Sequence, residues 1–500
     1  MPRTVQEPPG SRVAAALAQG RLGVGPVAFV AMAAIALLTV VAGGATTGWA
    51  VTGITGIPVA YLATGLILAV FSAGYVAMAC KIVNAGAFYT YIAHGLGKTW
   101  GVAASFVAVV AYNAMQIGLY GGFGKVLGDF VFGLAWPWYV WALLGCAAVG
   151  VLGLLSIDFN GWILAVLLLA EMAIAVVYSI VNVAHPADGH LSLDALSPRH
   201  LIGAGVGAAL AVAVAGFVGF ENTAVYGEES RNPKTTVARA TFLAVGVAAL
   251  FYGFVSWSMT VGTGPDQIVP RAKAEGTELI FNLAAPYVGQ PMIFLGHLLF
   301  ITSLFAALLS FHHTCARYFF ALGRERVLPA VLGRTSVRTK APKVGSLVQT
   351  VLAAGVIGLY AVKGWDPMVR LFFWVTVLAG LGVLILMTAT SAAVVGYFAR
   401  SGDRTGTSVW SAFVAPVLSG IALLYVLVVT LDQFATLLGV EAGDPLRWRL
   451  PALYLAVAAA GILWALFLRA KRPDVWAGIG RGANSVVPAE PVPATAAAGR

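Results

Sequence analysis

The sequence predicts an all-α integral membrane protein with twelve transmembrane helices. Of its 500 residues, 60% are hydrophobic and only 10% are charged. Soluble domains carry roughly 25% charged residues, and the mean hydropathy here is +0.88. Apolar runs close to the length of about 20 residues that a helix needs to cross a bilayer recur along the chain. These observations place the protein in the lipid bilayer.

The twelve expected spans are separated by short polar or glycine- and proline-containing segments. They fall at about 26–48, 58–80, 100–124, 138–156, 161–183, 203–226, 237–261, 289–317, 344–362, 368–398, 409–431 and 450–469.

The distribution of Lys and Arg predicts the orientation. If the N-terminus is cytoplasmic, 22 of the 30 basic residues lie in cytoplasmic segments and eight lie on the other face. This bias favours cytoplasmic N- and C-termini in a multi-pass protein of the plasma membrane. The net charge of +10 therefore reflects membrane topology, and no nucleic-acid partner is expected.

Three stretches outside the spans are expected to have distinct roles. Residues 1–24 form a cytoplasmic N-tail, and residues 471–500, rich in Ala, Pro and Gly, are expected to be a disordered cytoplasmic C-tail. Between spans 7 and 8, a short amphipathic stretch from Arg271 to Leu283 is expected to lie over the outer vestibule.

The sixth span has the composition of an interrupted helix. Gly216 and Gly219 weaken it, Phe217 and Phe220 flank the weak point, and Glu221 follows. Glycine lowers helix propensity, and a carboxylate at membrane depth costs several kcal/mol. Such a break is tolerated where it lines a cavity, so a solute site is expected there. The half-helix ends offer N–H donors to an anion and carbonyls to an ammonium, which suits a zwitterion.

The first span has a similar weak point, from Thr39 to Ala45, containing Gly43 and Gly44. The two weak points occupy matching positions if helices 1–5 and 6–10 form an inverted repeat. The alternative is that these glycines only allow helices to pack closely. For Phe217 and Phe220 the alternatives are an aromatic gate over the solute, with Phe217 favoured, or ordinary packing.

Two carboxylates and two hydroxyls are candidates for coupling ions to transport. Glu171 lies in the apolar fifth span, where burial disfavours its charged form and makes it a candidate proton carrier or a neutral hydrogen-bonded side chain. Glu221 is either a structural latch or a proton carrier. Thr302 and Ser303 would suit a sodium ion beside segment 1, or bond their own helix.

Polar residues of the third span are candidates for the solute path. Asn113 and Gln116 lie on one helical face, and such side chains line cavities or bond neighbouring helices. His312 and His313 are expected to pack. No spacing of Cys, His or carboxylates suggests a metal site, and no metal or other cofactor is expected.

Several motifs resemble those of the amino acid–polyamine–organocation (APC) transporters. Residues 216–233, GFVGFENTAVYGEESRNP, resemble the family's sixth-helix signature. Residues 84–91 are similar to its small-Gly element with spaced tyrosines, and the elements from Arg317 to Pro342 are similar to its loop after helix 8. The resemblance extends from residue 25 to about 470.

The resemblance implies a LeuT-like inverted repeat of helices 1–5 and 6–10, followed by two further helices. Repeat one would occupy about 25–185, repeat two about 200–400, and helices 11–12 about 408–470, within a transporter domain of residues 25–470. It also implies uptake of an amino acid or amine bound between the breaks of helices 1 and 6. The residues at those breaks are Val41, Ala42, Gly43, Gly44, Phe217, Val218, Gly219 and Phe220.

This sequence departs from the family pattern at two points. The helix-1 element is Ala-Gly-Gly, where the family commonly has Gly-Ser-Gly. Some relatives carry a Lys in helix 5 in place of a sodium ion, whereas this chain has Glu171 in that region. The coupling ion, proton or sodium, therefore stays open.

Charged residues after the sixth span predict a gate on the cytoplasmic side. Glu228, Glu229 and Arg231 would face the basic segment 317–343 and form salt bridges that break when the gate opens. As exposed pairs they would each contribute little to stability. The alternative is that these residues are only solvated charges of a loop.

The sequence thus predicts a secondary active transporter that imports a neutral amino acid or related amine by proton-coupled alternating access. Sodium coupling, solute exchange and a non-transporting nutrient sensor are the alternatives. No convergent catalytic cluster indicates an enzyme. The solute and the oligomeric state are not predicted.

Overall fold

The protein is an all-helical bundle in a computed structural model that describes residues 13–14, 17, 20–130, 136–155, 157–202, 205–402 and 404–482. Within these residues, eleven helices are long and apolar enough to cross a membrane. The fourth predicted span is the shorter apolar helix α7 (Trp138–Gly153). Its 16 residues extend about 24 Å at 1.5 Å per residue, less than a hydrocarbon core of about 30 Å. Each of the twelve predicted segments nevertheless contains a helix.

The two interrupted helices and the long helices are bounded as follows. The first span comprises α1 (Val24–Ile35), α2 (Leu37–Thr39), the π-helical turn η1 (Val40–Ala45) and α3 (Thr46–Thr52); the sixth comprises α9 (Val206–Phe217) and α10 (Asn222–Val225). The remaining long helices are α4 (Ile57–Lys81), α6 (Lys98–Phe130), α8 (Ile157–Ala184), α11 (Pro233–Thr263), α14 (Gln290–Arg324), α15 (Lys343–Lys363), η7 and α16 (Pro367–Phe373, Trp374–Ser401), η8 and α17 (Trp410–Val414, Ala415–Asp432) and α19 (Leu446–Lys471).

Short elements connect these helices. They are α5 (Ala87–Gly95), η2 (Asp194–Leu196), η3 (Pro198–Leu201), η4 (Gly227–Glu229), α12 (Ile268–Glu275), η5 (Gly276–Glu278), α13 (Leu279–Ala284), η6 (Ala330–Gly333), α18 (Phe434–Leu438) and α20 (Pro473–Gly478). Strand β1 (Val13–Ala14) pairs antiparallel with β2 (Thr335–Ser336).

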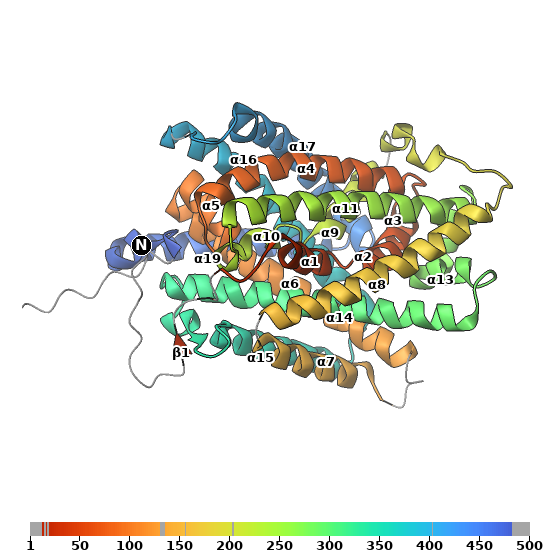
Figure 1. The fold of residues 1–500 in the computed structure, drawn as a ribbon, viewed down its shortest axis with the longest axis horizontal. Helices are drawn as coiled ribbons and strands as arrows, with labels where there is room; N and C mark the ends of the chain where they lie inside the picture. Colours follow the sequence, from red (N-terminus) through yellow and green to blue (C-terminus); the bar gives the residue numbers. More distant parts are fainter. Residues whose placement is uncertain are drawn as a thin grey trace, which may run out of the picture.

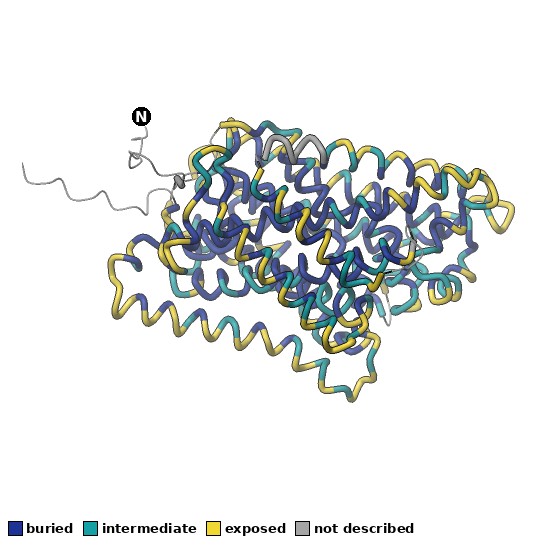
Figure 2. Tube along the Cα trace, turned by 90° about the horizontal axis from the view of Figure 1, so that it is seen from below, coloured by how far each residue is buried: buried dark blue, intermediate teal, exposed yellow. Residues whose placement is uncertain are grey.

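The interrupted helices lie in the centre of the bundle. Figure 1 shows α1, α9 and α10 between the α4–α11 pair and the α8–α14 pair. The first, third and sixth spans are the most buried, whereas α15, α17 and α19 are the most exposed. Exposed residues follow the outer helices in Figure 2, as expected for surfaces that face lipid. Helices α4 and α11, which form the second and seventh predicted spans, pack against each other.

The sixth span is interrupted where the sequence predicts. Helix α9 ends at Phe217, Val218 is extended with ψ 124°, and Gly219 has φ +123°. Helix α10 begins at Asn222. The chain therefore changes direction within the predicted Gly216–Glu221 stretch.

The first span is interrupted three residues before the predicted weak point. Helix α1 ends at Ala36, which has φ +53° and donates its N–H to Met32 O and Ala33 O. The predicted stretch from Thr39 to Ala45 stays helical, with a π-helical turn. Gly43 and Gly44 there permit close packing, since a Cβ on Gly44 would lie 3.2 Å from Tyr61 Oη. The predicted break within Thr39–Ala45 is therefore wrong, because this stretch stays helical, and the alternative of close packing is the one that its glycines fit.

Basic segments gather at one end of the bundle, which we call the basic end. It contains the α4–α5 loop, the residues after α10, the segment from Arg317 to Lys343 and residues 472–482, which contact one another there. The C-tail expected to be disordered from residue 471 is ordered up to Gly482, because Val475 and Ile479 are buried and the backbone beyond them is hydrogen-bonded. The rest of that tail lies outside the described residues.

Candidate functional site

The two helix breaks touch at Gly219. An added Cβ at this residue would lie 2.7 Å from Ala34 Cβ and 3.0 Å from Ala34 C, on the last turn of α1. Such distances are shorter than van der Waals contact, and the positive φ is one that residues with a Cβ rarely adopt. Gly216 allows a second close approach, because its Cβ would lie 2.9 Å from Val40 Cγ1. Glycines therefore bring the broken ends together.

Tyr252 of α11 joins the two breaks. Its hydroxyl lies 3.2 Å from Ile35 O at the end of α1 and 3.0 Å from Gly216 O at the end of α9, and its single proton is shared between these carbonyls. Its ring packs against Tyr61 and Phe217, with centroids 4.9 and 5.3 Å away. A tyrosine here satisfies carbonyls that a helix would otherwise leave without donors.

Glu221 holds the sixth-span break in shape. Tyr112 Oη donates to Glu221 Oε1 at 2.8 Å, and Gly219 N donates to Oε2 at 2.9 Å. Tyr75 Oη donates to the Glu221 carbonyl at 2.8 Å. Both carboxylate oxygens are engaged, which is the arrangement expected of a structural latch.

A cavity of about 150 Å³ lies between the two breaks. Ile35 and Gly216, at the ends of α1 and α9, line it, and so does Thr39 near the start of the second half of the first span. The lining also includes Gly43, Gly44, Ala215, Val218, Phe372, Thr376 and Gly380. None of the described residues that line it is ionisable, so binding there relies on backbone groups, hydroxyls and apolar contact.

The predicted substrate-binding residues divide into two groups. Gly43, Gly44 and Val218 line the cavity. Val41, Ala42, Phe217, Gly219 and Phe220 lie behind its wall and are buried. Phe217 belongs to the tyrosine cluster of α4 and α11, and Phe220 packs edge-on against Phe71. In this conformation neither phenylalanine covers the cavity.

The polar residues of the third span bond neighbouring backbone and helices. Asn113 Nδ2 donates to Val109 O at 2.7 Å. Gln116 contacts Tyr120, His312 and Gln349, which places it in a buried network between α6, α14 and α15. These two residues are not among those lining the cavity.

Glu171 and Ser303 come together beside the first-span break. Ser303 lies close to the Glu171 carboxyl. Ser303 Oγ also accepts from Thr39 N at 3.3 Å, and Thr39 lines the cavity. Glu171 Oε1 is buried without a hydrogen-bond partner. Thr302 instead donates to Leu299 O of its own helix at 2.9 Å. One short chain of groups therefore connects the carboxyl to the cavity.

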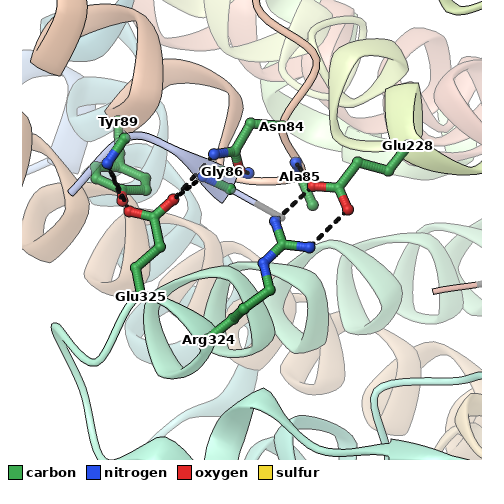
Figure 3. Close-up of polar contacts among 9 residues, drawn as sticks. Asn84, Ala85, Gly86, Tyr89, Glu228, Arg324 and Glu325 are labelled. Carbon is green, nitrogen blue, oxygen red and sulfur yellow. Dashed lines mark hydrogen bonds and ion pairs between the residues drawn. The ribbon is translucent and has the colours of Figure 1, made fainter. Parts of the chain in front are cut away.

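Two bidentate ion pairs close the basic end. Arg317 binds Glu229 at 2.7 and 3.0 Å, and Arg324 binds Glu228 at 2.7 and 2.6 Å. The second pair is shown in Figure 3. The partners lie where the sequence predicts, but the expectation of exposed pairs is wrong, because α14 continues to Arg324 and covers the residues after α10. Arg231 is exposed.

Tyr252 and the lining residues of η7 and α16 were not predicted. Tyr252 has no distinguishing neighbour in the sequence, and Phe372, Thr376 and Gly380 lie in a span with no evident break. Only packing of distant segments brings them to the site. Within the described residues, no cluster of three metal-binding side chains is present.

Comparisons with known proteins identify related transporters. An uncharacterised transporter of Mycobacterium tuberculosis is 28% identical over 61% of this chain and 69% of its own. The methylthioribose transporter of Bacillus subtilis is 25% identical over 60% of this chain and 66% of its own.

The solved structure of a mutant manganese transporter from Eremococcus coleocola has a TM-score of 0.53 at 13% identity, covering 88% of this chain and 94% of that chain. This likeness shows that the two proteins share a fold.

The family comparison covers nearly all the described helices. The amino acid permease family matches residues 22–468, which include both helix breaks and the ion pairs of the basic end. Its members and the relatives above are transporters and not enzymes. The chain belongs to the amino acid permease family, and the protein is an integral membrane transporter.

Proposed function

We propose that the protein imports a small neutral amino acid or a related amine by alternating access. The observation that carries the proposal is the cavity between the two helix breaks, where carbonyl ends of α1 and α9 meet the N-terminal end of the second half of the first span. The positive end of a helix favours a carboxylate, and free lone pairs of carbonyls favour an ammonium. A zwitterion satisfies both.

The size and charge of the cavity limit the solute. An apolar cavity of about 150 Å³ holds a molecule the size of benzene. Alanine, serine, threonine and valine are within that range, whereas a polyamine is too long. The absence of ionisable groups among the described lining residues gives a strongly cationic solute no compensating charge.

We propose that proton binding at Glu171 drives uptake. Its buried Oε1 has no partner, and Ser303 and Thr39 connect it to the cavity. A neutral Glu171 is compatible with this apolar site, while an ionised one favours a compensating cation. A sodium ion held by Glu171, Ser303 and Thr39 is the alternative that the same oxygens support. Exchange of one solute for another is a further alternative.

The proposed location is the plasma membrane, with the basic end in the cytoplasm. Lys and Arg are concentrated in segments at this end, and the positive-inside rule then places both termini there. In this orientation the Arg317–Glu229 and Arg324–Glu228 pairs form the closed inner gate, with Arg231 at its surface. Opening of the gate toward the cytoplasm requires these pairs to separate.

Uptake into proteoliposomes tests the coupling. Radiolabelled alanine, serine, threonine and valine are supplied under an imposed pH gradient, and then under a sodium gradient. Accumulation with the pH gradient alone is expected in the wild-type protein. Glu171→Gln is expected to lose accumulation but to keep exchange of internal for external solute, because Gln cannot carry the proton. If only the sodium gradient drives accumulation, the coupling ion is sodium and the proposed proton coupling is wrong.

A binding screen tests the solute class and the sensor alternative. Bound solute raises the unfolding temperature by mass action, so amino acids, amines and methylthioribose can be compared directly. A shift with a small neutral amino acid is expected. A shift by that amino acid without any counterflow in proteoliposomes would favour a non-transporting sensor.

A further inference from the structure

The C-terminal strap, which we define as residues 472–482, is hydrogen-bonded to a buried carboxylate at the basic end. Gly480 N donates to Glu325 Oε2 at 2.7 Å, and Gly482 N donates to Glu325 Oε1 at 2.8 Å. Asn84 Nδ2 completes the set at 3.0 Å, as shown in Figure 3. Glu325 is 2% exposed, so the strap backbone supplies two of the donors that a buried carboxylate requires.

A second set of contacts anchors the strap before it reaches Glu325. Lys98 Nζ donates to Trp476 O at 2.7 Å and to Ala477 O at 3.0 Å, near the C-terminal end of α20. Val475 and Ile479 are buried in an apolar cluster that includes Tyr89 and Leu322. Docking therefore combines apolar burial with hydrogen bonds to charged groups.

The glycines of the strap fit their places closely. Gly480 has φ +81°, and its Cβ would lie 3.0 Å from His94 Cε1. Gly482 has φ +57°, and its Cβ would lie 2.9 Å from Asn84 Nδ2 and 3.2 Å from Arg324 Nη2. A side chain at either position would lift the strap from the surface.

The strap covers the inner ion pair. Arg324, which binds Glu228, directly precedes Glu325 and lies under Gly482. The α4–α5 loop joins the same cluster, since Ala85 N donates to Glu228 Oε1 at 3.0 Å. The Arg324 side chain is 4% exposed and that of Glu228 is 10% exposed. Water that enters when the strap leaves would weaken this pair, because exposed ion pairs contribute little.

We propose that the C-terminal strap is a latch that stabilises the closed inner gate and must leave Glu325 before the basic end opens. It contacts the end of α14 and the α4–α5 loop, and both of these bind Glu228 after α10. These three segments have to separate for inward opening. The strap thereby sets the equilibrium between closed and inward-open states. This inference rests on the proposed function, since a gate at this end has meaning only for alternating access.

Hydrogen–deuterium exchange of the full-length protein tests the latch without any substrate. Gly482→Leu and Gly480→Val are expected to release the strap and to raise amide exchange in residues 82–89 and 227–232 about tenfold, as expected when buried hydrogen bonds to a charged group are lost. Lys98→Met removes the hydrogen bonds to Trp476 O and Ala477 O without adding volume, so a smaller rise in amide exchange is expected. Gly443→Leu is the matched control, because nothing lies within 4 Å of a Cβ there.

Two outcomes would overturn the proposal. One is a released strap, seen as fast exchange in residues 473–482, with residues 82–89 and 227–232 protected as in the wild type. The other is a strap that stays protected in both glycine variants. A failure of the wild-type protein to transport any amino acid would count against the proposed function alone, because the exchange measurement requires no transport.

Discussion

Gly219 lies where the broken ends of the first and sixth spans meet. Its φ of +123° and the 2.7 Å approach of an added Cβ to Ala34 both oppose any side chain. Gly219→Ala is expected to destabilise the protein by about 1–3 kcal/mol, the usual cost of strained backbone at a functional site, and to abolish uptake. Thermal unfolding and proteoliposome uptake measure the two effects.

The matched control is Gly246→Ala. Gly246 lies within α11, and nothing is within 4 Å of an added Cβ. Alanine is the better helix former, so this variant is expected to be at least as stable as the wild type. Equal stability of the two alanine variants would contradict the role assigned to Gly219.

The Arg317–Glu229 pair is buried, with both side chains 2% exposed. Glu229→Gln leaves the Arg317 charge without its partner and is expected to cost about 3–5 kcal/mol of unfolding free energy. The double variant Arg317→Met with Glu229→Met is expected to be more stable than Glu229→Met alone. Denaturant titration of the purified protein measures these differences.

An exposed pair serves as the comparison. Asp129→Asn removes the partner of Lys125, where both side chains are 37% exposed, and a change of about 0–1 kcal/mol is expected. A similar loss for Glu229→Gln and Asp129→Asn would show that burial does not decide the contribution of the Arg317 pair.

At the residue scale, the sequence predicts which side chains take part in the site better than it predicts which of them contact one another. The acidic pair Glu228 and Glu229 follows a broken helix and precedes a basic segment, so its partners could be anticipated from charge alone. The role of Tyr252 could not be anticipated, because it depends on the carbonyls of Gly216 and Ile35, which lie 36 and 217 positions earlier in the chain. Glu171 and Ser303 were each singled out, but only folding brings them together.

The C-terminal strap supplies a prediction on pH dependence. Burial raises the pKa of Glu325 from 4.5 to about 7, while hydrogen bonds from Gly480, Asn84 and Gly482 lower it in part. A carboxyl with a raised pKa binds its proton more tightly in the docked state. Strap docking is therefore expected to be strongest below about pH 4.5 and to weaken as the pH rises through about 7.

Protease cleavage of the strap between pH 5 and 8 measures this dependence. Cleavage is expected to be faster at pH 8 in the wild type and independent of pH in Glu325→Gln. Faster cleavage of the wild type at pH 5 would contradict the assignment. Other titratable or charged side chains also surround the docked strap, and Glu325→Gln separates their effect from that of Glu325. They are Tyr89, His94, Lys98, Glu228, Arg324 and Arg326.

At the element scale, hydropathy predicts the spans and glycine predicts one of the two breaks. The break of the first span is displaced because Ala36, and not Gly43 or Gly44, takes the left-handed conformation. The strap was taken for a disordered tail, since its Gly-Ile-Gly-Arg-Gly sequence has few apolar residues. Its order depends on donors that fit Glu325, and composition does not report such a fit.

At the scale of the whole molecule, the helix breaks, the cavity and the ion pairs form one assembly. The membrane-spanning helices could be predicted from the sequence, because apolar length is a property of single segments. The transporter class could be predicted from the interrupted sixth span and the family resemblance. The cavity wall formed by η7 and α16 could not, because that span shows no break in its sequence. The central claim is that the solute occupies this cavity.

Uptake of radiolabelled alanine, serine, threonine and valine by Ala215→Leu proteoliposomes tests that claim most directly. Ala215 lines the cavity, and the larger side chain occupies part of its 150 Å³. The overpacked side chain is expected to weaken solute binding by about 1–3 kcal/mol and therefore to reduce uptake about tenfold or more. The control Ala459→Leu, at an exposed position of α19, is expected to transport like the wild type. Undiminished uptake of all four amino acids by a correctly folded Ala215→Leu protein would contradict the claim.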